Sequence, residues 1–209
     1  MNEAKLIIFT RFPEPGRVKT RLIPILGERG AAELQRSMTR YTLDRVKEWE
    51  STNPHSIEVW FDGGDQEKMW HYFGQGFIYR RQPNGDLGDR MHQACKESLE
   101  SGYSRVVIIG TDCPSLTTGI LQSAFDALIQ NDLVLGPAND GGYYLIGLRK
   151  ASQRIFEGIP WGTHEVSERT IEIARSLKLS VALLDPLNDI DRPEDLKLID
   201  LGIVNFGIE

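Results

Sequence analysis

The sequence has few cysteines, no long apolar run and no excess of positive charge. Cys95 and Cys113 are the only cysteines among 209 residues, too few for a disulfide scaffold and not spaced as metal ligands. No apolar stretch approaches the roughly 20 residues that cross a bilayer, which excludes an integral membrane protein. The 30 acidic side chains outnumber 24 lysines and arginines, and this net charge of −6 argues against a nucleic-acid-binding protein.

The first residues also lack the features of a secretory signal. The apolar run after Lys5 is interrupted by Arg11 and Pro13, and a signal needs a basic start, a longer apolar stretch and a small-residue cleavage site. We therefore expect a reduced, soluble protein of the cytoplasm. The length and the absence of linkers or repeats predict one domain over residues 1–209, large enough for a full hydrophobic core.

Short apolar runs alternate with longer amphipathic segments along the chain. The runs predict strands at Lys5–Thr10, Ile57–Phe61, Phe77–Arg80, Arg105–Gly110, Leu133–Gly136, Tyr143–Leu148 and Val181–Leu184. Helical patterns occupy Ala31–Trp49, Leu87–Leu99, Gly119–Ile129 and His164–Leu177. This alternation predicts an α/β domain with a mainly parallel sheet and helices on both faces. Ligands bind such sheets beyond the carboxyl ends of the strands, so residues that follow strands are the site candidates.

A basic loop follows the first strand. Its four cations are opposed by Glu14 alone, which gives a local charge of +3, and two prolines and a glycine restrict its backbone. Arginine forks and a lysine point charge suit a di- or triphosphate, although the glycine spacing of a Walker A loop is missing. A solvated basic loop is the alternative. The phosphate-binding candidates are Thr10, Arg11, Gly16, Arg17, Lys19 and Arg21.

Carboxylates near two later strands are candidate metal ligands. Asp112 directly follows a buried strand and suits Mg²⁺ or Mn²⁺, although it could instead cap the next helix, a role for which Ser115 and Thr117 are better placed. Asp189 and Asp191 occupy alternate positions, so we expect only one to face the site. Two carboxylates about 5 Å apart repel by roughly 3 kcal/mol at an effective dielectric of 20. A divalent cation between them would turn that repulsion into attraction.

Three further segments offer contacts to substrates. Asn139, Asp140, Gly141, Gly142 and Tyr143 follow the fifth predicted strand and could bind a hydroxylated or amino acceptor, or form only a hairpin turn. Gly85, Leu87 and Gly88 open a helix and could receive a nucleobase or sugar, or belong to a helix cap. Trp161 could line the pocket or pack in the core.

These segments together resemble the bacterial DUF2064 family. The matching stretches are FTRFPEPGRVKTRL, GDLGDRM, GTDCPSLT, LGPANDGGYYLIGL, IPWGTHEV and NDIDRPEDL. The family is related to 2-phospholactate guanylyltransferase and to molybdenum-cofactor nucleotidyltransferases. The resemblance implies a GT-A (nucleotide-diphospho-sugar transferase) fold with a mixed, mostly parallel sheet. It further implies that Arg11, Arg17 and Lys19 hold phosphates, that Asp112 with Asp189 or Asp191 holds Mg²⁺, and that Asp140, Gly141 and Gly142 lie near the acceptor.

The sequence departs from relatives in two places that bear on activity. A proline-bearing loop replaces the glycine-rich loop of sugar nucleotidyltransferases, and Thr-Asp-Cys at 111–113 replaces the Asp-x-Asp motif of GT-A glycosyltransferases. Four loop cations suit a leaving pyrophosphate better than a diphosphate already held by metal. We therefore expect nucleotidyl transfer to a small phosphorylated acceptor, with Arg17, Lys19 and Asp112 catalytic. A glycosyltransferase with Asp140 as base, or a non-catalytic nucleotide- or sugar-binding module, are the alternatives.

Overall fold

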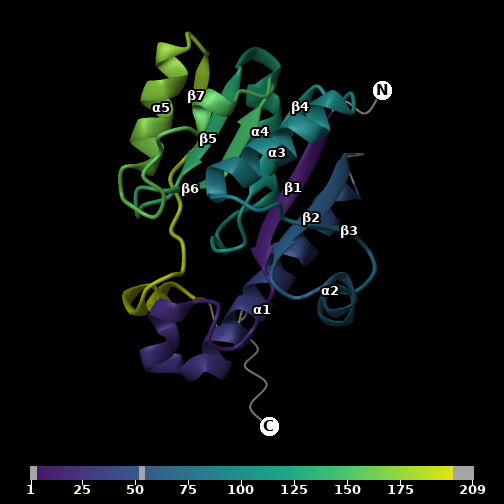
Figure 1. Ribbon diagram of the computed structural model, residues 1–209, viewed down its shortest axis with the longest axis vertical. Helices are drawn as coiled ribbons and strands as arrows, with labels where there is room; N and C mark the ends of the chain where they lie inside the picture. Colours follow the sequence, from purple (N-terminus) through teal and green to yellow (C-terminus); the bar gives the residue numbers. More distant parts are fainter. Residues whose placement is uncertain (1–3, 52–54, 200–209) are drawn as a thin grey trace.

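A seven-stranded mixed sheet forms the centre of the computed structural model, which describes residues 4–51 and 55–199 (Figure 1). The strand order is β3-β2-β1-β4-β6-β5-β7. The strands are β1 (Ala4–Arg11), β2 (Ser56–Asp62), β3 (Ile78–Arg81), β4 (Arg105–Ile109), β5 (Leu133–Pro137), β6 (Tyr143–Leu148) and β7 (Val181–Leu183). β6 runs antiparallel to β4 and β5, and the other pairings are parallel. The predicted α/β class with a mostly parallel sheet is confirmed.

Helices cover both faces of the sheet. They are α1 (Ile23–Glu50), α2 (Gln66–Phe73), α3 (Leu87–Glu100), α4 (Thr118–Gln130) and α5 (Val166–Ser176), with short 3₁₀ turns η1 (Thr20–Leu22), η2 (Gln153–Ile155) and η3 (Pro193–Leu198). Apolar side chains of α1, α2 and α4 pack in one core layer, and those of α3 and α5 in another. Among the described helices, none is long and apolar enough to span a bilayer.

The first strand shows why its sequence is an unbroken apolar run. Leu6 and Ile8 pack against the α1, α2 and α4 layer, whereas Ile7 and Phe9 pack against the opposite layer. All four side chains are buried. A strand covered on both faces needs apolar residues at every position. The central place of β1 in the sheet therefore explains why its sequence does not alternate between apolar and polar residues.

One predicted helix needs correction, and one helix was missed. α1 begins at Ile23 rather than at Ala31, with a kink at Gly27 (φ 68°, ψ 168°) that separates its first turn from the rest. α2 was not predicted, because eight residues are too short for a clear helical period. The one signal in the sequence was Asp65, a favoured N-cap residue. Its carboxylate accepts a hydrogen bond from the Lys68 backbone N–H at 2.8 Å.

The strand order reverses at β1. From β1 the chain adds β2 and β3 on one side and then returns to place β4 on the other side. Such a reversal opens a crevice beyond the carboxyl ends of the two central strands. The residues after Thr10 and after Ile109 therefore border the expected binding position.

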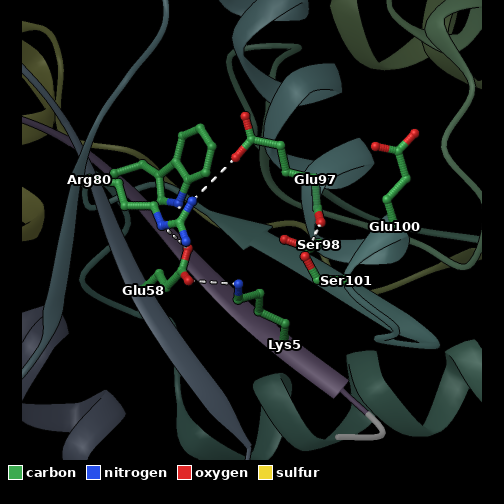
Figure 2. A pocket seen from close by; sticks show the side chains of 8 residues that line it. Lys5, Glu58, Arg80, Glu97, Ser98, Glu100 and Ser101 are labelled. Carbon is green, nitrogen blue, oxygen red and sulfur yellow. Dashed lines mark hydrogen bonds and ion pairs between the residues drawn. The ribbon is translucent and has the colours of Figure 1, made fainter.

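A charged cavity lies between the strands β1, β2 and β3 and the C-terminal end of α3. Lys5 at the start of β1 donates to Glu58 Oε1 at 2.7 Å, and Glu58 Oε2 also accepts from Trp60 Nε1 at 2.9 Å. Figure 2 shows Arg80 bridging Glu58 and Glu97 above this pair. The cavity holds about 270 Å³. Only 7% of the Lys5 side chain and 5% of the Glu58 side chain are exposed, so the pair is buried.

Replacing Lys5 with methionine should destabilise the protein by about 3 kcal/mol, because removing one partner leaves a buried carboxylate without its closest cation. Urea unfolding followed by circular dichroism measures the loss. The double variant Lys5→Met/Glu58→Gln should recover part of it, since the unpaired charge is gone. A single variant within 1 kcal/mol of the wild type contradicts this view of the pair.

Candidate active site

The loop between β1 and η1 has a fixed backbone and exposed arginines. Phe12 N–H donates to Asp62 O at 2.8 Å, and the Phe12 ring lies edge-on to Tyr72 with centroids 5.2 Å apart. Val18 is buried at the other end of the loop. Arg11 and Arg17 are exposed, and Arg17 pairs only loosely with Glu14, at 3.5 Å. The loop therefore presents guanidinium groups to solvent from an anchored frame.

Lys19 differs from the other loop cations because its side chain is only 2% exposed. Its Nζ lies 2.7 Å from Asp112 Oδ1 and also donates to the Ile190 carbonyl oxygen. The Asp112 carboxylate is half exposed. The structure thus joins three segments that the sequence suggested separately: the basic loop, the turn after β4, and the segment near residue 190.

The segment after β7 crosses back to the start of α1, as the yellow and purple ribbons show in Figure 1. Ile190 N–H donates to Asp112 O at 2.9 Å, and the Ile190 side chain packs among Leu22, Leu34 and Met38. On one side of Ile190, Asp191 pairs with Arg21. Asp191 and Arg21 therefore neutralise each other, which leaves Asp189 as the carboxylate of this segment for the crevice.

Asp189 lies among other carboxylates. Burial, and next the negative charge of Asp140, raise the pKa of Asp189 to about 6, and Asp195 and Asp191 act in the same direction while a backbone hydrogen bond opposes them. The charges of Asp112, Asp189 and Asp140 also add to burial in raising the pKa of the Cys113 thiol. Cys113 is buried and the pKa of its thiol is raised, which fits a packed residue rather than a nucleophile.

The Asp189→Asn variant should be more stable than the wild type at pH 8 by about 2 kcal/mol in a metal-free buffer. The folded protein holds the Asp189 proton up to about pH 6 against an ordinary value of 3.8, so wild-type stability falls as pH rises through this window. The gain should therefore shrink towards zero near pH 4. Melting temperatures with EDTA at several pH values measure it, with exposed Asp44→Asn as control. A pH-independent difference contradicts the assignment.

The donor set fits a metal that arrives with a ligand. Within residues 4–51 and 55–199, no three His, Cys, Asp or Glu side chains form a ready metal site. Asp112 and Asp189 offer two carboxylates, which is the number Mg²⁺ usually takes from protein when substrate phosphates and water complete its shell. Each of the two carboxylates is a ligand of the kind that Mg²⁺ or Mn²⁺ takes when phosphates supply the rest of its shell.

The residues after β5 form a tight turn on the N-terminus of α5. Asp140 Oδ1 accepts from Gly142 N–H at 2.7 Å, and Ser167 N–H donates to Gly141 O at 2.9 Å. Asn139 Nδ2 donates to Asn188 Oδ1 at 2.7 Å, which ties the turn to the segment that carries Asp189. The hairpin-turn alternative is therefore present, and it leaves Asp140 exposed beside the crevice.

Aromatic side chains border the start of α3. A Cβ atom on Gly88 would lie 2.7 Å from Trp161 Cζ2, so the indole covers this glycine. Trp161 also lies edge-on to Tyr143, with centroids 6.3 Å apart. The Tyr143 hydroxyl points to Met91 Sδ at 3.8 Å, so it faces the core rather than an acceptor. Leu87 is 45% exposed.

The helix-cap alternative for residues 84–88 is also present. Asp86 Oδ1 accepts a hydrogen bond from the Asp89 backbone N–H at 2.8 Å, and Asp89 Oδ2 accepts one from the Asp86 backbone N–H at 3.2 Å. Gly85 adopts φ 122° before this cap. The cap orients the first turn of α3, where the exposed Leu87 and the covered Gly88 lie.

Thr10 is placed differently from the prediction of a phosphate contact. Its side chain is buried beneath the loop, with Oγ1 2.9 Å from Thr39 Oγ1 and 3.3 Å from Thr111 Oγ1. Gln35 Nε2 donates to the same hydroxyls at 3.2–3.4 Å. This polar network supports the turn that carries Asp112. The signal available in the sequence was the spacing of four between Gln35 and Thr39, which puts both polar side chains on one helix face.

Arg90 also supports the site, although it was not among the residues predicted from the sequence. It reaches Asp62 Oδ2 at 3.1 Å and Gln82 Oε1 at 3.2 Å, and its Nε donates to Gly85 O at 3.0 Å. Arg90 therefore joins the ends of β2 and β3 to the loop before α3. Its position in the GDLGDRM stretch was the available signal.

Residues 44–163 match the model of a family described as uncharacterised proteins conserved in bacteria, DUF2064. The chain belongs to the DUF2064 family. The match includes Asp112, the turn at Asp140 and Trp161, whereas the basic loop and Asp189 lie outside it. No functionally curated protein matches the chain.

Solved structures show the fold of this DUF2064 protein. One from Desulfovibrio desulfuricans G20, described as a candidate nucleotide-diphospho-sugar transferase, is 34% identical with a TM-score of 0.88 over 99% of this chain and 90% of that one. A 4-diphosphocytidyl-2C-methyl-D-erythritol synthase from Anaerococcus prevotii DSM 20548 is 12% identical, with a TM-score of 0.61 over 94% of each chain. A Mycobacterium tuberculosis H37Rv protein in complex with manganese is 14% identical, with a TM-score of 0.56 over 95% of this chain and 97% of that one.

These likenesses confirm the nucleotide-diphospho-sugar transferase fold. The two structures below 25% identity speak for the fold alone, and the first extends the similarity to nearly the whole sequence.

Proposed function

We propose that the protein is a metal-dependent nucleotidyltransferase. A phosphate oxygen of a small phosphorylated acceptor attacks the α-phosphorus of a nucleoside triphosphate, the bond to the bridging oxygen breaks, and pyrophosphate leaves. The observation that carries this proposal is the anchored four-cation loop at the carboxyl end of β1, with its Lys19 in contact with Asp112. Phosphoryl chemistry of this kind needs positioning and charge neutralisation rather than a protein nucleophile.

The loop cations divide into two groups. Arg11 is exposed and Arg17 is exposed with only a loose pairing to Glu14, so both could bind the β- and γ-phosphates in forked geometry. Lys19 is paired with Asp112, and Arg21 is paired with Asp191. These two cations have to leave their aspartates before they can contact the phosphates of a nucleotide. Gly16 keeps its backbone at φ 77° and shapes the turn before Arg17. The positive groups stabilise charge that accumulates on the leaving pyrophosphate.

The carboxylates take a different part. Asp112 and Asp189 would hold Mg²⁺ or Mn²⁺, which supplies charge neutralisation at the phosphates. Asn139, Asp140 and the Gly141–Gly142 turn are tied to the segment that carries Asp189 through the Asn139–Asn188 hydrogen bond, and they would orient the acceptor. Gly85, Leu87 and Gly88 at the start of α3, with Trp161 above them, would border the nucleobase or the acceptor.

One observation favours a second function. The 34% identical structure is described as a candidate nucleotide-diphospho-sugar transferase, and the exposed Asp140 carboxylate could serve as a base that activates an acceptor hydroxyl. In that reaction a sugar moves from a nucleotide-sugar donor and a nucleoside diphosphate leaves.

A coupled assay for pyrophosphate distinguishes the functions. The four common nucleoside triphosphates, each with Mg²⁺ and a panel of phosphorylated metabolites, should release pyrophosphate with at least one pair. Turnover only with a UDP- or GDP-sugar supports the glycosyltransferase and contradicts nucleotidyl transfer. Binding without any turnover supports a binding module. A thermal-shift screen of nucleotides with and without Mg²⁺ selects the pairs to assay first.

A further inference from the structure

The Lys19 ammonium lies against the Asp112 carboxylate, where a metal bound by Asp112 would also have to lie. Its Nζ lies 2.7 Å from Asp112 Oδ1, and the same ammonium donates to the Ile190 carbonyl oxygen. Carboxylate and carbonyl oxygens are also the ligands that Mg²⁺ and Mn²⁺ prefer. An ammonium and a divalent cation cannot share one carboxylate at such distances without strong repulsion.

The backbone of Lys19 has an unfavourable conformation, which the contacts of its side chain compensate. Lys19 adopts φ 47° and ψ 41°, a left-handed conformation that is costly for a residue with a Cβ atom. Its side chain is almost wholly enclosed, whereas Arg17 two residues earlier is 77% exposed. The two contacts of the ammonium therefore keep a loop cation inside the protein, away from solvent and from any phosphate.

We propose that Lys19 and a divalent cation compete for Asp112, so that the metal binds well only after phosphates draw Lys19 out of its contacts. This inference rests on the proposed function, since it supposes a metal at Asp112 and phosphates at the loop. A protein built this way resists free metal ions and assembles metal and nucleotide together. Lys19 then acts twice, first as a stand-in cation and afterwards as a ligand of the phosphates.

Mn²⁺ binding without nucleotide tests the competition. Free Mn²⁺, followed by electron paramagnetic resonance, should bind the Lys19→Met variant at least tenfold more tightly than the wild type, since methionine keeps the side-chain volume but not the charge. Lys68→Met is the matched control: Lys68 forms another lysine–aspartate pair, with Asp65 at 3.5 Å on the surface of α2. Its Mn²⁺ affinity should equal that of the wild type.

A second measurement uses the wild-type protein and does not depend on the folding of a variant. Acetylation of lysines followed by peptide mass spectrometry should find Lys19 poorly reactive without metal, and several-fold more reactive at saturating Mn²⁺. Lys68 should react equally in both conditions. Unchanged Lys19 reactivity at saturating Mn²⁺ overturns the proposal.

The remaining outcomes separate this proposal from the proposed function. Equal Mn²⁺ affinity of wild type and Lys19→Met overturns the competition and leaves nucleotidyl transfer standing. Absence of Mn²⁺ binding in both proteins overturns the competition and also removes the metal from the proposed function. A tenfold difference together with no pyrophosphate release supports the competition and contradicts nucleotidyl transfer alone.

Discussion

Replacing Asp112 with asparagine should lower Mg²⁺-dependent nucleotide affinity about a hundredfold, equivalent to about 2.7 kcal/mol. The amide keeps the shape of the side chain but lacks the negative charge that a divalent cation requires. The half-exposed carboxylate next to Lys19 is the reason to place this loss at Asp112 rather than elsewhere. Isothermal titration with the nucleotide that gives the largest thermal shift, with Mg²⁺ and with EDTA, measures it.

The same experiment needs a control for simple charge removal. Asp126→Asn on α4 changes an exposed carboxylate that accepts a hydrogen bond from Gln122 at 2.9 Å, and its affinity should equal that of the wild type. In EDTA, wild type and Asp112→Asn should bind the nucleotide within a few-fold of one another. If Asp112→Asn binds as well as the wild type with Mg²⁺ present, the metal assignment is wrong.

Replacing Gly141 with alanine should destabilise the protein by about 4 kcal/mol, from backbone strain and overpacking together. Gly141 adopts φ 93°, and a Cβ atom there would lie 2.0 Å from the carbonyl oxygen of His164. Since that oxygen belongs to the backbone before α5, a side-chain rotation cannot relieve the overlap. For a chain of this length the melting temperature should fall by roughly 10 °C.

Gly158 provides the matched control for this substitution. It also has a positive φ, 68°, but nothing lies within 4 Å of the position of its Cβ atom. Gly158→Ala therefore reports the backbone strain alone, and we expect a loss of about 1 kcal/mol. Equal losses at Gly141 and Gly158, measured by thermal unfolding, would show that the contact with His164 is not rigid.

The strands could be predicted because a strand buried on both faces is apolar at almost every position. Runs such as RVVIIG at 105–110 have few residues that could face water, and each predicted strand lies within one residue of its observed ends. The direction of β6 could not be predicted from YYLIGL, because a buried run looks the same in either orientation. The alternation of strands and helices indicated parallel pairing, and the tight turn at 138–142 explains the antiparallel exception.

The candidate site was predictable by residue type but not by pairing. Charged residues after strands indicated the edge of the sheet at which Lys19 and Asp112 meet. Nothing local indicates that Lys19 would be enclosed against Asp112, 93 residues away. Nothing local indicates the Arg21–Asp191 pair either, whose members are 170 positions apart. Such contacts depend on the path of the chain after β7 across the start of α1, which is a property of the whole fold.

The most direct test of nucleotidyl transfer follows the α-phosphate itself. A nucleoside triphosphate labelled with ³²P at the α-phosphate is incubated with Mg²⁺, the protein and each phosphorylated acceptor, and the products are separated by chromatography. The proposed function predicts label in a new acceptor–nucleotide product, with one pyrophosphate released for each. Label that stays in the nucleotide across the whole panel, while an unlabelled sugar moves from a nucleotide-sugar donor, would contradict it.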